Sequence, residues 1–138
     1  MKKYILALVA VVMLAASASA GNVPILYQKL PQQSRTFVKK YWLEANLNLI
    51  YKTDFGYQVT LDNGVVVKFD RNGKWFNMTG FDALPTAMLP QGINNYMAQY
   101  YPDEIVLSVK RHSKGYDITV TKGLVMKFTL QGKFIRLD

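Results

Sequence analysis

The chain contains no cysteine and only one histidine in 138 residues. Without cysteine it can form no disulfide, no thiol nucleophile and no thiolate metal site, so its stability has to come from packing. The single histidine, His112, has neither a cysteine nor a second histidine with which to form a nucleophile–base pair. We therefore expect a protein that is not an enzyme and that has no catalytic residues, no metal site and no cofactor.

Long apolar runs and glycine clusters are also missing. The longest apolar run, Ile5–Ala16, is shorter than the roughly 20 residues that a helix needs to cross a bilayer. The 9 glycines occur singly, which leaves no phosphate-binding loop. The sequence thus predicts no membrane span and no nucleotide site.

The first 20 residues have the pattern of a secretory signal peptide. Lys2 and Lys3 form its charged end, the apolar run follows, and Ala18-Ser19-Ala20 is a small-residue cleavage site. We expect cleavage near Ala20 and Gly21 and a periplasmic or secreted mature chain, residues 21–138, that forms one domain.

The chain as a whole carries more positive than negative charge. Loss of the two signal-peptide lysines lowers the formal net charge from +8 to about +6, which is still basic. The charge is spread rather than clustered, which favours a solvated surface over a dedicated anion site and gives no indication of nucleic-acid binding.

The sequence contains an internal tandem repeat. Residues Leu30–Met78 align without a gap with Leu89–Leu137, and every matched pair of residue numbers differs by 59. Three of the identical pairs are glycines at predicted hairpin turns, so the repeat preserves turn geometry as well as composition. The expected organisation is repeat 1 at 30–78, a linker at 79–88 and repeat 2 at 89–137.

Each repeat is expected to begin with a helix and to continue with strands. Pro31 and Pro90 suit the first turn of a helix, and apolar residues after Pro90 recur with helical spacing. Pro102 ends the second helix, whereas Leu43 stands at the equivalent place in the first repeat and would let that helix run a turn longer. The alternating residues of each repeat then predict an antiparallel meander, although 45–52 does not settle its own register.

Turn chemistry predicts the buried face of these strands. In the loop 62–64 a left-handed glycine pairs Leu61 with Val65, and the loop at Lys122-Gly123 pairs Ile118 with Met126 in the same way.

The last turn of each repeat is ambiguous. A two-residue turn at Asn72-Gly73 pairs Phe69 with Phe76, whereas a three-residue turn would bury Asn77 and, in the second repeat, Arg136. The desolvation cost of those polar groups favours the shorter turn.

The shorter turn places one aromatic residue of each repeat on the face away from the helices. An antiparallel sheet covered on one side normally has polar side chains on the other, so exposed rings there are typical of interface anchors. An alternative is that helix residues of the other repeat, or the linker with Phe81 and Leu84, fold over them. The candidate partner-binding residues are Trp75, Phe134, Lys68, Lys127, Arg136, Asp70 and Asn77.

Several motifs give the chain a family resemblance. They are Leu89-Pro90, Tyr100-Tyr101-Pro102, Gly115-Tyr116-Asp117-Ile118, Lys127-Phe128 and Gly132-Lys133-Phe134. In these the chain resembles the PepSY-like, beta-lactamase-inhibitor-like repeat of small exported bacterial proteins. The resemblance implies an α+β fold in which each repeat packs a helix on a four-stranded antiparallel meander, and in which the two meanders join into one concave antiparallel sheet that binds a partner. An acidic strand and an aspartate that are frequent in this family are replaced here by Val109-Lys110-Arg111 and Thr129.

Two functional hypotheses follow. The first is a non-enzymatic module that captures a protein or peptide partner in the cell envelope on its sheet face, as an inhibitor or as a simple binder. The second is a glycan or polyanion binder that uses the same rings for stacking and the lysines for charge. A structural subunit of an envelope complex is a third alternative, and exposed edge strands make a monomer or a weak homodimer the expected state.

Overall fold

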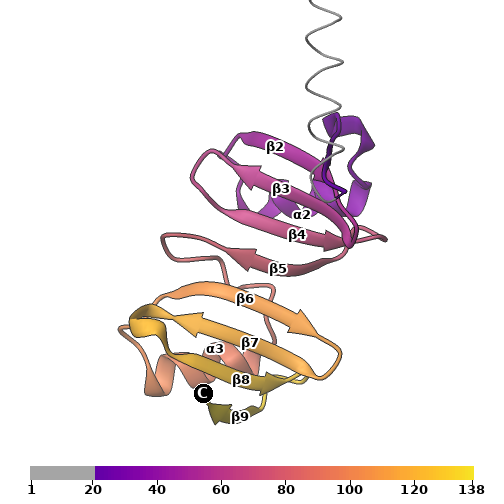
Figure 1. Ribbon diagram of the computed structural model, residues 1–138. Coiled ribbons are helices and arrows are strands. Elements are labelled where there is room, and N and C mark those ends of the chain that lie inside the picture. The colour runs from indigo at the N-terminus through magenta and orange to yellow at the C-terminus, as the bar shows by residue number, and fades with distance from the viewer. Residues whose placement is uncertain (1–20) are drawn as a thin grey trace, which may run out of the picture. The chain divides into compact units, whose positions relative to one another are not determined.

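The computed structural model describes residues 21–138, and the predicted signal peptide, Met1–Ala20, lies outside this range. The described residues form a mixed α/β fold with two α-helices and one antiparallel sheet of nine strands, which follow one another in chain order (Figure 1). In Figure 1, α2 lies behind β3 and β4, and α3 lies behind β7 and β8. Each helix thus covers one face of its part of the sheet and leaves the other face without a helix.

The elements have the following bounds: β1 (Val23–Pro24), η1 (Tyr27–Lys29), α2 (Gln32–Tyr41), β2 (Leu47–Lys52), β3 (Gly56–Leu61), β4 (Val66–Asp70), β5 (Trp75–Thr79), α3 (Gln91–Tyr100), β6 (Val106–His112), β7 (Gly115–Val120), η2 (Thr121–Gly123), β8 (Val125–Thr129) and β9 (Phe134–Leu137).

Both α-helices begin directly after a proline and end at an equivalent residue. Pro31 and Pro90 have φ values of −53° and −52°, as their rings require, and stand immediately before the first helical residue. Trp42 and Tyr101 leave the helical conformation with φ values of −134° and −139°. The prediction of a longer first helix is therefore wrong, because the first helix ends without needing a proline.

Two compact units make up the described chain. The first contains residues 21–62 and 68–74, and the second contains residues 63–67 and 75–138. Strand β5 belongs to the second unit, although the sequence analysis assigns it to repeat 1.

Each unit packs its helix on its strands through an aromatic contact. In the first unit the ring of Phe37 lies 6.0 Å from that of Phe69 at an interplanar angle of 85°. In the second, Tyr96 lies 5.5 Å from Phe128 at 82°. Phe69 and Phe128 are both almost fully buried. The two edge-to-face pairs therefore occupy equivalent core positions, since their members are 59 residues apart in the sequence.

The hairpin turns that the sequence predicts at 62–64 and at Lys122-Gly123 lie between β3 and β4 and between β7 and β8. Gly64 has a φ of +85°, as the left-handed loop position requires. In the second unit Ile118 pairs with Met126, as predicted, and the N–H of Val120 donates to the carbonyl of Leu124 over 2.9 Å. Lys122 and Gly123 both have positive φ values in this turn.

The two-residue turn predicts Met126 opposite Leu137 in the second unit, and this pair is present, but the pair that it predicts next to the turn, Phe128 with Ile135, is wrong. Phe134 stands opposite Phe128, while Arg136 remains opposite Lys127. A β-bulge between these pairs absorbs the extra residue of β9. With regular pairing, an inward Phe134 would force Arg136 inward as well. The bulge instead places the ring inside and keeps the guanidinium outside.

A buried hydrogen bond joins α2 to the last turn of the first unit. The hydroxyl of Ser34, which is fully buried, donates to the carbonyl of Gly73 over 2.7 Å. We expect Ser34→Ala to lower the free energy of unfolding by about 1–2 kcal/mol, because the carbonyl would be left buried without a donor. Denaturant unfolding measures this loss. Thr36→Ala, on the exposed side of the same helix, is the control, and an equal loss in both variants would contradict the assignment.

The inward position of Phe134 has a similar test. Its ring stacks on Tyr96 with centroids 4.4 Å apart and planes 7° apart. We expect Phe134→Ala to lower the free energy of unfolding by about 2 kcal/mol through lost burial and ring stacking. Ile135→Ala, at the half-exposed neighbouring residue, should cost less than half as much. Equal small losses would place the Phe134 ring in solvent.

Candidate functional site

The helix-free face of the second unit carries a row of polar side chains across five strands. Strand pairing aligns these residues: four of them lie one position away from the buried Met78, Val109, Ile118 and Met126, and the fifth stands opposite Lys127. The row consists of Asn77, Lys110, Asp117, Lys127 and Arg136. Three predicted site residues, Asn77, Lys127 and Arg136, are thereby brought onto one surface.

The charges of this row are largely paired. The Lys127 ammonium lies 3.0 Å from the carboxylate of Asp117 and 3.6 Å from that of Asp138. Arg136 donates to Asp138 over 2.9 Å and thereby lowers the pKa of that carboxyl group. The two predicted cations therefore have carboxylate partners within the unit, which reduces their attraction for an external polyanion.

Asp117 is held in its charged form by two neighbours. Burial alone would raise the pKa of its carboxyl group, but hydrogen bonds from Lys127 and His112 outweigh that effect, so the pKa is lowered. The side chains of Lys127 and Asp117 are only 22% and 23% exposed. The pair thus lies in the partly desolvated middle of the face.

His112 has both ring nitrogens in use. Its Nδ1 lies 3.3 Å from the backbone N–H of Lys114, and its Nε2 lies 3.2 Å from the carboxylate of Asp117. An Nδ1 that accepts a hydrogen bond requires the proton on Nε2, which donates to Asp117. In this arrangement the imidazole offers no free nitrogen to accept a proton from a substrate.

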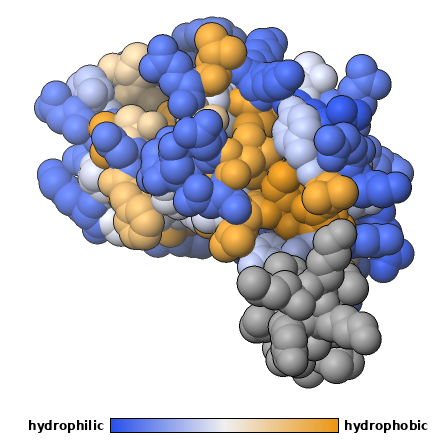
Figure 2. All heavy atoms as spheres, turned by 90° about the horizontal axis from the view of Figure 1, so that it is seen from above, coloured by the Kyte–Doolittle hydropathy of each residue, from blue (hydrophilic) through white to orange (hydrophobic). Residues whose placement is uncertain are grey.

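The first unit presents a more apolar helix-free face. Leu49 and Tyr51 stand opposite Thr60 and Gln58, which alternate with the buried Val59. Leu49 is 49% exposed, so a large apolar side chain lies in water on this face. Figure 2 shows one face of the molecule on which hydrophobic side chains gather within a largely hydrophilic surface.

Phe55 extends this apolar surface. Its side chain is 38% exposed, and the ammonium of Lys68 lies 5.5 Å from the centre of its ring. Lys68 stands between Val67 and Phe69, which are both fully buried, and so it points to the helix-free side. We call Leu49, Tyr51, Phe55 and Lys68 the anchor face.

Sequence reasoning missed the three apolar members of the anchor face. A bulge between Leu47 and Leu49 shifts the register of β2, and the alternation of 45–52 therefore gives no consistent face. The signal that could have identified them is Ile50, which is aligned with the buried Val109 of the second unit in the 59-residue alignment. That alignment assigns Leu49 and Tyr51 to the opposite face.

Three other predicted site residues have structural contacts instead. The carboxylate of Asp70 accepts hydrogen bonds from the backbone N–H groups of Asn72 and Lys74, both over 2.9 Å, and so closes its own turn. The ring of Trp75 lies 6.4 Å from that of Tyr116, which is buried and pairs with Phe128 on the helix-covered side. Together with the inward Phe134, this corrects the expectation of two outward rings.

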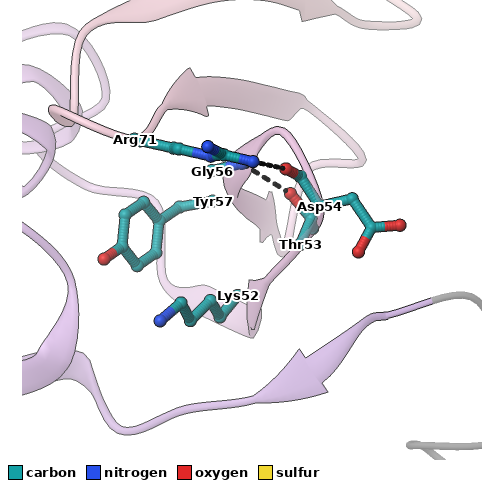
Figure 3. Close-up of a pocket in the computed structure, with 6 residues that line it drawn as sticks. All are labelled: Lys52, Thr53, Asp54, Gly56, Tyr57 and Arg71. Carbon is teal, nitrogen blue, oxygen red and sulfur yellow. Dashed lines mark hydrogen bonds between the residues drawn. The ribbon is translucent and has the colours of Figure 1, made fainter.

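A separate pocket opens at the end of the β2–β3 hairpin. It has a volume of about 470 Å³ and is lined by Lys52, Thr53, Asp54, Gly56, Tyr57 and Arg71 (Figure 3). The guanidinium of Arg71 donates to the backbone carbonyl of Asp54 over 3.2 Å, and Gly56 N–H donates to the hydroxyl of Thr53 over 3.1 Å. The carboxylate of Asp54 points away from Lys52 and Arg71.

Residues 21–138 contain neither a cluster that could hold a metal ion nor a membrane-spanning helix. No three acidic or histidine side chains of this range gather in a way that could hold a metal ion. In the same range, no helix is both long enough and apolar enough to cross a membrane.

The chain matches a known protein family and several solved structures. Residues 55–136 match the family described as "Putative beta-lactamase-inhibitor-like, PepSY-like". A "putative periplasmic protein from DUF2874 family" of Bacteroides vulgatus is 30% identical, with a TM-score of 0.79 over 87% of this chain and 98% of that one. A "putative calcium-regulated periplasmic protein" of Bacteroides thetaiotaomicron is also 30% identical, with a TM-score of 0.79 over 85% and 96% of the two chains. No protein with a curated description is significantly similar.

The lowered pKa of Asp117 predicts a pH-dependent contribution to stability. Because the folded pKa is below the unfolded value of about 3.9, this contribution is complete above that pH and is lost as the pH falls through the folded pKa. Asp117→Asn should reduce the free energy of unfolding by about 0.5–1 kcal/mol near neutral pH, and this difference from the wild type should shrink in acid.

Urea unfolding of both proteins from neutral pH into the acid range measures the difference. Lys127→Met removes the principal partner and should shrink the same pH dependence while the carboxylate is retained. Curves for wild type and Asp117→Asn that stay parallel at all pH values would contradict the assignment.

Proposed function

The chain belongs to the PepSY-like, beta-lactamase-inhibitor-like family, and we propose that it is an exported, non-enzymatic module that captures a protein or peptide partner on the helix-free side of its sheet. The periplasmic descriptions of its relatives support export. The signal-peptide pattern of residues 1–20 supports the same conclusion.

The observation that carries this proposal is the anchor face of the first unit. A sheet that is covered by a helix on one side normally shows polar residues on the other. Here an aliphatic side chain and two aromatic ones remain at least partly exposed there, beside a lysine. Aromatic rings in a polar surround are typical of the few residues that supply most of the energy of a protein interface.

The polar row of the second unit serves a different purpose in this proposal. Asn77, Lys127 and Arg136 already interact with, or stand opposite, polar groups of their own unit. Exposed charge pairs add little affinity but can select and orient a partner of complementary charge. We assign them to orientation, and Lys68 to the rim of the anchor face.

We further propose that the mature protein, residues 21–138, is one domain that arose by duplication. Corresponding elements of the two halves begin 59 residues apart. This holds for the two α-helices and for the strand pairs β3 and β7, β4 and β8, and β5 and β9. The turns before β5 and β9 have the same hydrogen bonds, from Gly73 N–H to the carbonyl of Asp70 and from Gly132 N–H to that of Thr129, each over 2.9 Å. A shared scaffold supports one ancestral unit.

Affinity capture from a cell-envelope fraction tests the role of the anchor face. The double variant Tyr51→Ala, Phe55→Ala should lose the protein that the wild type retains, with affinity reduced by about 30-fold or more. The midpoint of thermal unfolding should change little, because both side chains are partly exposed. Leu43→Ala, at an 81% exposed leucine outside this face, is the matched control.

Two results would argue against capture through apolar anchors. One is a partner retained equally by the wild type and the double variant, when both are folded. The other is retention of anionic glycans alone, with binding that falls steeply with salt, which would favour the polyanion alternative.

A further inference from the structure

The pocket at the β2–β3 hairpin lies on the helix-covered side of the first unit. Lys52 pairs with Tyr57 across the two strands, and Tyr57 alternates with Gln58 on the helix-free face. The pocket is therefore separate from the anchor face, and an inference about it is independent of the proposed function. Its volume of about 470 Å³ is in the range of small-molecule sites.

The second unit fills the corresponding space with a tryptophan. In the second unit Arg111 pairs with Tyr116. These two residues are aligned with Lys52 and Tyr57, which pair in the same way in the first unit. The guanidinium of Arg111 lies 5.1 Å from the centre of the Trp75 ring, and the ring of Tyr116 lies 6.4 Å from it. An indole thus occupies a slot between a cation and a tyrosine.

Strand register explains why this slot is open in the first unit. In the first unit Pro24 stands opposite Tyr51. In the second unit Asn77 stands opposite Lys110, the residue that the 59-residue alignment matches with Tyr51. Pro24 and Asn77 therefore have corresponding places in the sheet. Two residues before Asn77 is Trp75, whereas two residues before Pro24 is Asn22. The first unit therefore has a small amide where the second has an indole.

The open slot also carries one more positive charge than its counterpart. Arg71 takes the place that Leu130 has in the second repeat. Among residues 21–138, neither Lys52 nor Arg71 forms an ion pair, and the nearby carboxylate of Asp54 is directed away from both (Figure 3). The pocket thus combines a tyrosine ring with two cations that have no carboxylate partner in the described chain.

We propose that this pocket binds an aromatic ring that carries a carboxylate, such as the C-terminal aromatic residue of a peptide. The ring takes the place that the indole of Trp75 has in the second unit, against Tyr57 and beneath the cation of Lys52. The carboxylate is bound by Arg71 and Lys52, whose donors suit a planar anion.

Isothermal titration with N-acetyltryptophan tests the proposal. We expect saturable binding in the millimolar range or tighter, and at least about tenfold weaker binding of N-acetyltryptophanamide, which lacks the charge. N-acetylalanine, which has the carboxylate but no ring, should bind at least as weakly. Equal binding of all three ligands, or no binding of N-acetyltryptophan, would overturn the proposal.

Variants of the pocket make the test specific. Arg71→Ala should weaken N-acetyltryptophan about tenfold but leave the amide unaffected, and Lys74→Ala, an exposed lysine outside the pocket, is the control. Asn22→Trp should supply the ring from the chain itself and abolish binding while the protein stays folded. Full binding by folded Asn22→Trp or by Arg71→Ala would overturn the assignment.

Two sources of this chemistry can be separated with further ligands. A short peptide that ends in a free tryptophan carboxylate represents a polypeptide terminus, and indole-3-acetate represents a free aromatic acid. Tighter binding of the peptide identifies a C-terminus, and tighter binding of indole-3-acetate identifies a small acid. Both outcomes support the aromatic carboxylate site, whereas equal binding of the peptide and its C-terminal amide would contradict it.

Discussion

The burial of large rings beneath each helix decides how the rest of each unit is arranged. Phe128 and Phe134 both belong to the helix-covered side, yet Arg136, two residues after Phe134, cannot follow it into the core without a large desolvation cost. The bulge in β9 reconciles these demands. It brings one more ring under the helix and keeps the charged row of the opposite face in register.

The repeated sequence predicted the fold well because its signals are local. Prolines before the helices, glycines with positive φ in the turns and alternating aliphatic residues act over a few positions, and each is present where the alignment requires it. The site was predicted less well because it depends on pairing irregularities. Single bulges in β9 and β2 reversed the expected direction of Phe134 and hid that of Leu49. No residue pattern within either strand identifies its bulge.

The two units show how one scaffold can carry two surfaces. Residues 59 apart share a strand position, but Tyr51, Gln58 and Phe55 of the first unit correspond to Lys110, Asp117 and Lys114 of the second. Core positions such as Val59 and Ile118 are apolar in both units, although the buried Ser34 of the first unit is aligned with the buried Ile93 of the second. Side chains on the side without helices can thus differ between the units without disturbing the packing of the core.

The short first strand has a consequence for assembly. β1 pairs with Tyr51 and Lys52, and the next residue, Ile25, donates its N–H to the carbonyl of Ile50 over 3.0 Å, whereas β2 extends from Leu47 to Lys52. The outer hydrogen-bonding groups at the beginning of β2 therefore lack a neighbouring strand in the described chain, and the exposed Leu49 lies within that stretch. An extended segment of another polypeptide can add there as a tenth strand, so that main-chain recognition and an apolar side-chain contact would coincide at one margin of the sheet.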